Sequence, residues 1–317
     1  MRRSRLAIVL GLAGLILLGL FVLRPVWDAR QQALLDDAHA TALSPPPAPL
    51  SVFHLGHSLV GRDMPAMLEQ LAGTGHSHAS QLGWGTSLRA HWYPEEPING
   101  FDTENAHNRF LPAHEAIGSG QFDAVILTEM VELRDAIAYQ DSPTYKSNWA
   151  DLARDASPTT RVYLYETWHR LDDPDGWLTR LERDYTTLWR DEILAGDIRR
   201  SGPDRATRVI PAGQVMAAFV RKIEAQGGLG NAPDREALFA RDDTGALDMI
   251  HLSDLGKYLV ALTHYAVLYK RSPVGLPAAL SRADGTPATA PTPEVARLMQ
   301  ETVWEVVQTL PETGVGS

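Results

Sequence analysis

Short apolar runs alternate along the chain with longer stretches that carry apolar residues at helical spacing. Four runs are short enough for buried strands, at 50–55, 122–127, 161–165 and 208–211. Helical spacing follows or separates them, at 64–71, 149–156, 177–194, 214–224, 253–269 and 295–306. Strands that alternate with helices predict an α/β fold with a mostly parallel sheet, because parallel strands need crossover connections.

Ligands in such sheets bind beyond the carboxyl ends of the strands. We therefore expect the chemistry of this chain at 56–59, 128–130 and 166–169, which follow three of the predicted strands.

The N-terminus predicts a membrane anchor. Three arginines lie within residues 1–5, and residues 6–23 then carry no charge, enough for about 27 Å of helix. Flanking arginines favour a cytoplasmic N-terminus, so in a bacterium the remaining chain would lie outside the cytoplasm, in the periplasm. The alternative is a cleaved signal peptide, which would make the protein secreted; however, small-residue cleavage sites appear only at 38–40 and 40–42.

The domain boundaries follow from composition. Residues 24–49 are expected to form a linker, stiffened by the prolines at 43–49. One domain is then predicted at 50–310, followed by a disordered tail at 311–317. The chain has 44% hydrophobic residues, which is enough for a core, and no cysteine, which excludes disulfides and a cysteine nucleophile. Its formal net charge of -10 argues against nucleic acid as a partner.

Ser58 is the first candidate for chemistry, in the sequence Gly56-His57-Ser58-Leu59 after the first predicted strand. A serine is a poor nucleophile unless a base removes its proton. Asp248 and His251, spaced D-x-x-H before a predicted helix, supply such a base with an orienting carboxylate. The alternatives are that Ser58 caps a helix and that Asp248 and His251 are ordinary loop residues.

These two blocks together resemble those of the SGNH/GDSL hydrolases, with His57 where the family carries aspartate. The resemblance implies a flavodoxin-like three-layer α/β/α sandwich over 50–310. It also implies that Ser58 is the nucleophile, His251 the general base and Asp248 its orienting acid. No metal or other cofactor is implied.

The family's oxyanion hole combines the serine amide with a glycine and an asparagine from two further blocks. By resemblance Ser58 supplies the first amide and Gly85 the second, with Gly83 as the substitute. The third block departs from the family pattern, because the chain reads Thr-Glu-Met-Val at 128–131 and Met130 cannot donate a hydrogen bond. Asn105, Asn108 and Thr128 remain open as replacement donors.

Other side chains near the strand ends are candidates for binding substrate: His57, Trp84, Glu129 and Trp168. The tryptophans suit stacking on sugar rings, although large rings also fill cores. Glu129 belongs to an acidic group whose ordinary role is a solvated helix start. His76 and His78 form an H-x-H pair, but three convergent ligands are needed for a metal site, and we expect none.

The sequence thus predicts a serine esterase that hydrolyses an acyl ester, with acetyl groups on carbohydrate as the suggested substrate and the membrane as its anchor. Two alternatives remain open. One is an O-acyltransferase that passes the acyl group to an extracytoplasmic polysaccharide, and the other is a non-catalytic glycan-binding protein of the same fold.

Overall fold

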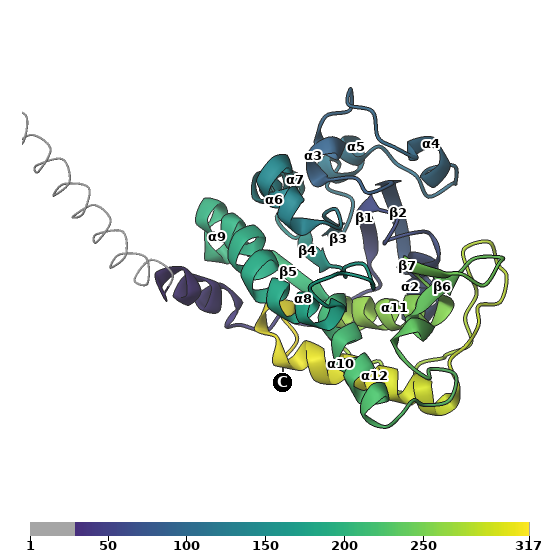
Figure 1. The fold of residues 1–317 in the computed structure, drawn as a ribbon. Helices are drawn as coiled ribbons and strands as arrows, with labels where there is room; N and C mark the ends of the chain where they lie inside the picture. Colours follow the sequence, from purple (N-terminus) through teal and green to yellow (C-terminus); the bar gives the residue numbers. More distant parts are fainter. Residues whose placement is uncertain (1–28, 317) are drawn as a thin grey trace, which may run out of the picture.

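A five-stranded parallel sheet forms the centre of the computed structural model, which describes residues 29–316 (Figure 1). Its strands run in the order β2-β1-β3-β4-β5, and every neighbouring pair is parallel. Their bounds are Ser51–His57 (β1), Ser77–Gly83 (β2), Ala124–Leu127 (β3), Arg161–Glu166 (β4) and Arg208–Pro211 (β5). The expected parallel α/β sheet is confirmed, and its strand order is one of the common doubly wound orders.

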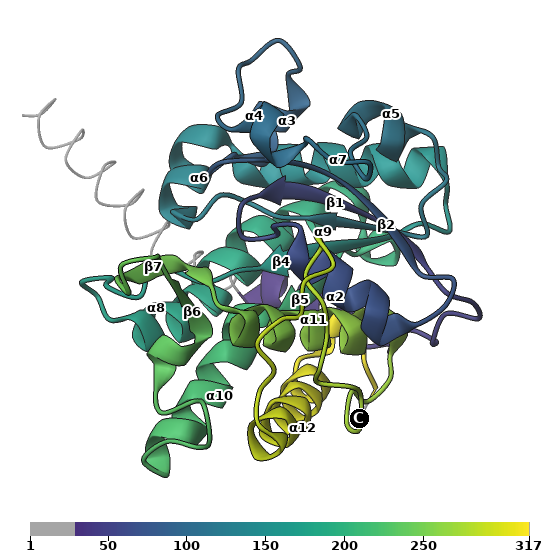
Figure 2. The same cartoon turned by 90° about the vertical axis from the view of Figure 1, so that its right-hand side faces the viewer.

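Helices cover both faces of the sheet, as Figure 2 shows. The first face carries α2 (Asp63–Ala72), α8 (Trp177–Asp184), α10 (Ala212–Ala225), α11 (Asp254–Tyr269) and α12 (Pro293–Thr309). The second face carries α3 (Leu88–Trp92), α5 (Ala113–Gly118), α6 (Leu133–Gln140), α7 (Ser142–Ala156), the π-helix η1 (Tyr185–Leu194) and α9 (Ala195–Ser201). The short helix α4 (Phe101–Glu104) has no buried residue.

The alternation of side chains along β1 explains the two cores. Val52 packs with α2 and α11 in the first core, whereas Phe53 and Leu55 pack with Trp149 of α7 in the second. Successive side chains of a strand point to opposite faces, so a strand buried on both sides reads as a continuous apolar run. The short apolar runs of the sequence therefore became central strands.

A separate two-stranded antiparallel sheet lies beside the main one, and the sequence had not predicted it. It pairs β6 (Phe239–Arg241) with β7 (Leu247–Leu252). We call residues 239–252 the hairpin. It leads directly into α11, whose N-cap is Ser253, as predicted, with the hydroxyl accepting a hydrogen bond from the amide of Gly256 at 3.3 Å.

The expected linker is wrong at 29–39, because these residues form a helix that docks on the domain. Its Leu35 and Ala38 are buried in a cluster with Val209 of β5. The ring of His39 bonds the carbonyls of Leu35 and Thr207 at 2.8 and 3.0 Å. An apolar stripe next to polar residues was enough to form this helix, despite the prolines that follow it.

The disordered tail expected at 311–317 is also wrong for the described residues 311–316. Pro311–Thr313 form a 3₁₀ turn (η4), and Glu312 and Thr313 are buried. Glu312 pairs with Arg190 at 2.6 Å, and the carbonyl of Gly314 accepts a bond from the amide of Leu43. These polar contacts fix the end of the chain against the docked N-terminal segment.

The predicted membrane-spanning segment at 6–23 lies outside the described residues. Within 29–316, the structure contains no helix both long and apolar enough to cross a bilayer.

Candidate active site

Ser58 lies in the turn between β1 and α2, at the carboxyl edge of the sheet. Gly56 lets β1 approach β3 closely here, since a Cβ atom at Gly56 would lie 2.5 Å from the Cβ of Thr128. The helix-cap alternative for Ser58 is wrong: α2 begins at Asp63 after Arg62, which makes no side-chain cap. The serine hydroxyl is therefore available for other contacts.

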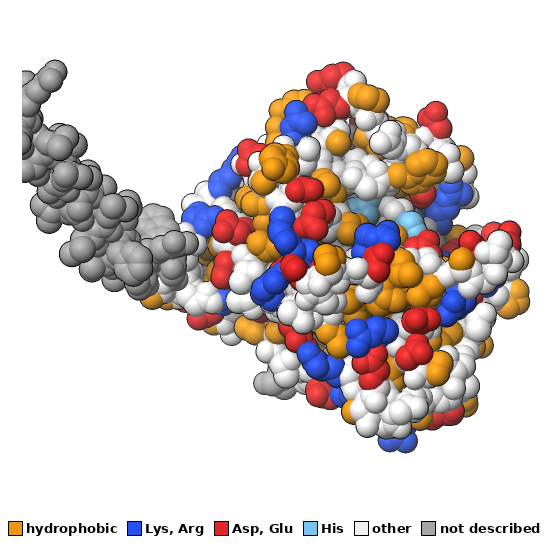
Figure 3. Space-filling model, viewed as in Figure 1, with side chains coloured by type: hydrophobic (Ala, Val, Ile, Leu, Met, Phe, Trp, Pro, Cys, Tyr) orange, Lys and Arg blue, Asp and Glu red, His pale blue; other side chains and the backbone are white. Residues whose placement is uncertain are grey.

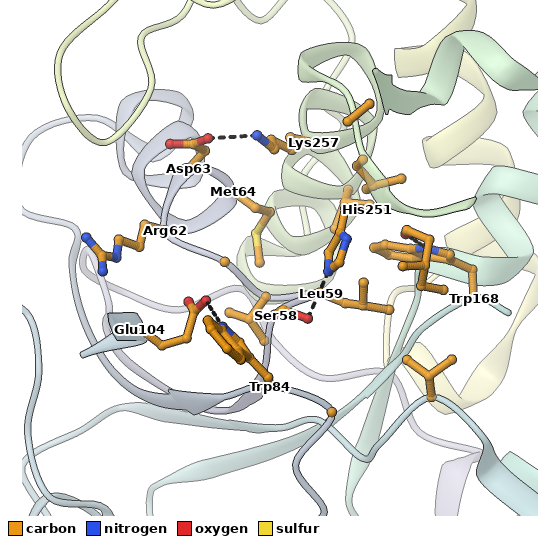
Figure 4. A pocket seen from close by; sticks show the side chains of 18 residues that line it. Ser58, Leu59, Arg62, Asp63, Met64, Trp84, Glu104, Trp168, His251 and Lys257 are labelled. Atoms are coloured by element: carbon orange, nitrogen blue, oxygen red, sulfur yellow. Dashed lines mark hydrogen bonds and ion pairs between the residues drawn. The ribbon is translucent and has the colours of Figure 1, made fainter. Parts of the chain in front are cut away.

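The structure brings the two ends of the domain together at this hydroxyl. His251 Nε2 lies 3.1 Å from Ser58 Oγ, and His251 Nδ1 lies 2.9 Å from Asp248 Oδ2. Figure 4 shows the serine and the imidazole facing each other across the cleft. This is the hydrogen-bonded order of nucleophile, base and orienting acid that serine hydrolysis requires.

Asp248 is held as an acceptor by its own loop. Its Oδ1 accepts the amides of Ile250 and His251 at 2.8 and 2.9 Å. Partial burial acts to raise the pKa of Asp248, but these two amides and the His251 ring outweigh burial and lower it below its ordinary value. An ionised Asp248 requires a proton on Nδ1 of His251, which leaves Nε2 free to accept the serine proton.

The hairpin that carries both residues is attached to the loop after β4. Trp168 donates its indole N–H to the carbonyl of Ile250 at 2.7 Å, and the amide of Leu171 donates to the carbonyl of Met249 at 2.7 Å. Both acceptors lie between Asp248 and His251 in sequence. The two bonds therefore fix the segment that presents the base.

A cleft of about 660 Å³ surrounds the Ser58–His251 pair. Its walls include Trp84, Gly85, Val131, Trp168 and Lys257 (Figure 4). Trp84 is 52% exposed and donates its indole N–H to Glu104 at 2.8 Å. The expected place of Trp84 beside the nucleophile is thus what the structure shows.

Trp168 also lines this cleft, but it is only 1% exposed. Its indole N–H is already used by Ile250. Trp168 therefore mainly holds the hairpin in place. Of the two tryptophans, only Trp84 has a ring exposed enough to contact a ligand.

The expectation that His57 binds substrate is wrong, because its side chain is fully buried. Its Nε2 donates to the carbonyl of Glu129 at 2.8 Å, and its Nδ1 accepts the amide of Leu59 at 3.4 Å. Burial lowers the pKa of His57 to about 4, so the ring is neutral. His57 therefore ties the serine turn to the end of β3.

The expectation that Glu129 binds substrate is also wrong, since this side chain is buried and turned away from the cleft. Its carboxylate accepts the hydroxyl of Ser142 at 2.6 Å and the amides of Leu88 and Met130 at 3.2 and 2.9 Å. Burial raises the pKa of Glu129, although these three hydrogen bonds act to lower it. Neither substrate binding nor a solvated helix start describes it.

The expectation that Asn105 donates to the oxyanion is wrong as well. Its amide nitrogen donates to the carbonyls of Leu82 and Phe101, both at 2.8 Å, and its oxygen accepts the amide of Leu82 at 3.0 Å. Both N–H groups of the side chain are therefore occupied, and neither serves an oxyanion. Thr128 is equally unsuited, since it is fully buried against Gly56.

Gly85 lies in the cleft wall, with a φ of 55° and open space where a Cβ would be. Gly83 does not line the cleft; a Cβ there would meet Ile98 and Thr86. In the third block it is Val131, and not Met130, that faces the cleft. An apolar side chain therefore occupies the wall position from which a donor could reach the cleft.

Sequence reasoning missed two charged groups of the cleft. Lys257 of α11 pairs with Asp63 of α2 at 2.7 Å. Arg62 follows the serine turn and donates to the carbonyl of Thr103. The only signal for them was their short distance in sequence from Ser58 and His251. Among residues 29–316, no three histidine or carboxylate side chains lie close enough together to hold a metal ion.

Comparison with known proteins gives a fold and no family. No protein-family model matches the chain, and no curated protein sequence matches it. A DUF4886 family protein from Bacteroides uniformis is similar in structure, with a TM-score of 0.53 at 13% identity over 82% of this chain and 95% of that one. This likeness shows a shared fold.

Two further solved structures overlap more loosely. One, from Parabacteroides merdae, is described as a GDSL-like lipase (TM-score 0.40, 12% identity, 69% of this chain and 94% of that one). The other is a Streptococcus pneumonia protein described as a platelet activating factor (TM-score 0.32, 14% identity, 78% and 98%). Neither overlap is close enough to support a functional conclusion. The chain is an α/β protein that shares its fold with a DUF4886 family protein.

Proposed function

We propose that the chain is a serine ester hydrolase of the SGNH type, built on a flavodoxin-like three-layer sandwich. The observation that carries the proposal is the continuous chain of hydrogen bonds from Ser58 through His251 to Asp248. The three residues come from opposite ends of the domain, and a purely structural role explains neither their order nor their place in an open cleft.

In the proposed reaction Ser58 Oγ attacks the acyl carbon of the ester while His251 Nε2 takes the serine proton. Asp248 stabilises the imidazolium that forms. His251 then returns the proton to the leaving alcohol as the ester C–O bond breaks, which leaves an acyl-serine. Water, activated by the same imidazole, attacks the acyl-serine and releases the carboxylic acid and the free serine.

The oxyanion that forms in each step needs hydrogen-bond donors. We assign this role to the amides of Ser58 and Gly85, since both residues line the cleft. A third donor from the Val131 position is missing. Loss of one such donor commonly costs about 2.7–4 kcal/mol of transition-state stabilisation, so we expect a slow enzyme.

The substrate we propose is an acyl ester, such as an acetyl ester, on a carbohydrate outside the cytoplasm. The exposed indole face of Trp84 stands in the same cleft as Ser58, and aromatic faces pack well on sugar rings. The location rests on the arginine-flanked apolar segment 6–23. Because the His251 side chain is 47% exposed, water reaches the base, which favours hydrolysis over transfer of the acyl group.

The test uses the full chain in detergent with p-nitrophenyl acetate. Wild type should release p-nitrophenol, and a fluorophosphonate probe should label Ser58. Ser58→Ala should abolish both signals while the melting temperature stays within a few degrees of wild type. Turnover that persists in Ser58→Ala would falsify the assignment, and a folded wild type that neither turns over nor labels would identify a non-catalytic binding protein.

A further inference from the structure

A second cavity, of about 930 Å³, lies across the serine turn from the catalytic cleft. We call it the His76 groove. The residues that matter to it are Glu69, Gln70, His76, His78, His107 and Arg109. The segment 61–63 lines both the groove and the cleft, so the two adjoin along one edge of the fold. Figure 3 shows histidine side chains (pale blue) at the surface, between the upper and lower parts of that view.

Two histidines of the groove have a ring nitrogen without a partner among the described residues. His76 is 4% exposed, and its Nδ1 lies 2.8 Å from the hydroxyl of Tyr269. That hydroxyl also accepts the amide of Leu50, and Nε2 of His76 has no partner among the described residues. His107 accepts the amide of Arg109 at Nδ1 and is left with an unpartnered N–H at Nε2.

Buried polar groups normally have a hydrogen-bond partner, and an exception calls for an explanation. Two unpartnered ring nitrogens in one groove are explained by a ligand, or by water that the ligand displaces. A hydroxyl group suits both, because it can accept the N–H of His107 and can either donate to or accept from Nε2 of His76.

The charges of the groove exclude a strongly ionic ligand. Its lining carries three arginines and three carboxylates, namely Arg62, Arg109, Arg282, Asp63, Glu69 and Asp284. The main pairs are closed within the protein: Glu69 with Arg109 at 3.0 Å, and Asp63 with Lys257 at 2.7 Å. Burial lowers the pKa of His76 and His78 to about 4, so their rings add no charge. Arg282 pairs with Asp254, so among the described residues only Arg62 of the three arginines makes no ion pair, and a phosphate or a carboxylate would find a single unpaired cation here.

We propose that the His76 groove binds neutral sugar units of a glycan chain whose esterified unit lies in the catalytic cleft. Sugar hydroxyls both donate and accept, which matches a groove that mixes N–H donors with carboxylate acceptors. The glycan would cross the segment 61–63, which lies between the two cavities. This proposal rests on the proposed esterase and extends it from a single ester to an oligosaccharide.

The first experiment compares substrates of different length. Wild type should hydrolyse O-acetylated xylo-, manno- or cello-tetraose with a kcat/KM about tenfold above that for the acetylated monosaccharide, because about 1.4 kcal/mol of added binding is a factor of ten. Ala66 of α2 lines the groove, so Ala66→Trp should remove this preference. Ala138→Trp, at an exposed position of α6, is the matched control and should keep it. All three proteins should hydrolyse p-nitrophenyl acetate equally.

The second experiment separates the groove from catalysis. Ser58→Ala should bind the deacetylated tetrasaccharide of the preferred series in calorimetry, and adding Ala66→Trp should abolish the heat signal. His76→Phe keeps an aromatic ring and removes both nitrogens, so a folded variant should bind about tenfold more weakly. If the melting temperature of His76→Phe shows that the variant does not fold, the Ala66→Trp result alone tests the groove.

The outcomes distinguish the two proposals. Binding without any hydrolysis of p-nitrophenyl acetate would overturn the esterase and keep the groove. Hydrolysis of p-nitrophenyl acetate, with equal rates on short and long sugars and no calorimetric binding of any of the three tetrasaccharides, would overturn the groove and keep the esterase.

Discussion

The proposed nucleophile and its proposed base are held by two regions of very different construction. Ser58 follows the central strand β1, which pairs with strands on both sides and is buried from both faces. Asp248 and His251 lie on the hairpin, whose two strands pair only with each other among the described residues. A two-stranded hairpin alone is marginal in water, so the position of His251 depends on the packing of Phe239 and Leu252 in the first core and on a few polar contacts.

This difference shows where the proposed active site is sensitive. Changes near Ser58 act on a packed core, and they should affect folding before they affect geometry. Changes near His251 act on an attached element, and they should affect activity while the domain remains folded. The predictions below test this contrast on both sides, from the largest expected effect to the smallest.

Asp248→Asn should have the largest effect on the hairpin side. The side-chain amide of asparagine is neutral and can donate its N–H to Nδ1, which favours the wrong tautomer of His251. The imidazolium also loses its charged partner. We expect kcat on p-nitrophenyl acetate to fall by about 10³–10⁴-fold with a nearly unchanged melting temperature. A fall of less than tenfold would show that Asp248 has no orienting role.

Trp168→Phe tests the attachment of the hairpin. It removes the indole N–H that holds the carbonyl of Ile250, and we expect about a tenfold loss in kcat with little change in KM. Trp149→Phe is the matched control, since its buried indole donates a similar bond to Leu88 but lies in the other core. Trp149→Phe should lower stability and leave kcat unchanged; equal kcat losses in both variants would contradict the positioning role.

Val131→Asn tests the missing donor on the strand side. The position faces the cleft, so a side-chain N–H there can stabilise the oxyanion. We expect kcat to rise about fivefold, less than the 10²–10³-fold of an optimised donor, because this strand end was not shaped around an asparagine. The control Val131→Leu should give no rise. A decrease in Val131→Asn with an intact fold would place the oxyanion elsewhere.

Acid should lower the stability of the domain through the histidines that are buried around the central sheet. Burial lowers the pKa of His57, His91 and His264 to about 4 and also holds that of His54 well below its ordinary value, while an unfolded histidine keeps about 6.5. The unfolded state therefore binds more protons than the native state between pH 6.5 and 4, so stability is full above pH 6.5 and is lost as pH falls through this window. Melting temperatures measured from pH 7 to pH 4.5 should decrease steadily.

His54→Leu is the smallest change and tests the origin of that acid loss. Both ring nitrogens of His54 are buried without a partner among the described residues. Leucine has no proton to gain, so the variant should melt a few degrees above wild type at pH 5, and the difference should be smaller at pH 7. The same gain at both pH values would show that packing, and not protonation, causes it.

Particular residues show what the sequence could and could not predict. The apolar runs predicted β1, β3, β4 and β5, because burial on both faces favours apolar residues, whereas β2 escaped prediction because most of its residues are polar. The pairing of Ser58 with Asp248 and His251 could be inferred from the order of two short motifs. The roles of His57, Glu129 and Asn105 could not, since a polar residue near a strand end has the same pattern whether it points into the cleft or into the core.

The hairpin and the docked helix at 29–39 escaped prediction for a related reason. The strand β6 has only three residues, too few for a periodic signal, and it pairs with β7 in an irregular register. The helix at 29–39 is stabilised by Leu35 and Ala38 packing on a surface that the local sequence does not reveal. Tertiary packing decided both elements.

The docked N-terminal helix determines which way the proposed enzyme would face. The segment after it bonds the first residues of β4 and β5: Ser44 and Thr41 offer their carbonyls to Arg161 and Arg208, and His39 bonds Thr207. All of these contacts lie at the amino edge of the sheet, opposite the edge that carries Ser58. A bead, sensor surface or partner that held the helix at 29–39 would therefore occupy the amino edge of the sheet and leave the proposed catalytic cleft open on the far side.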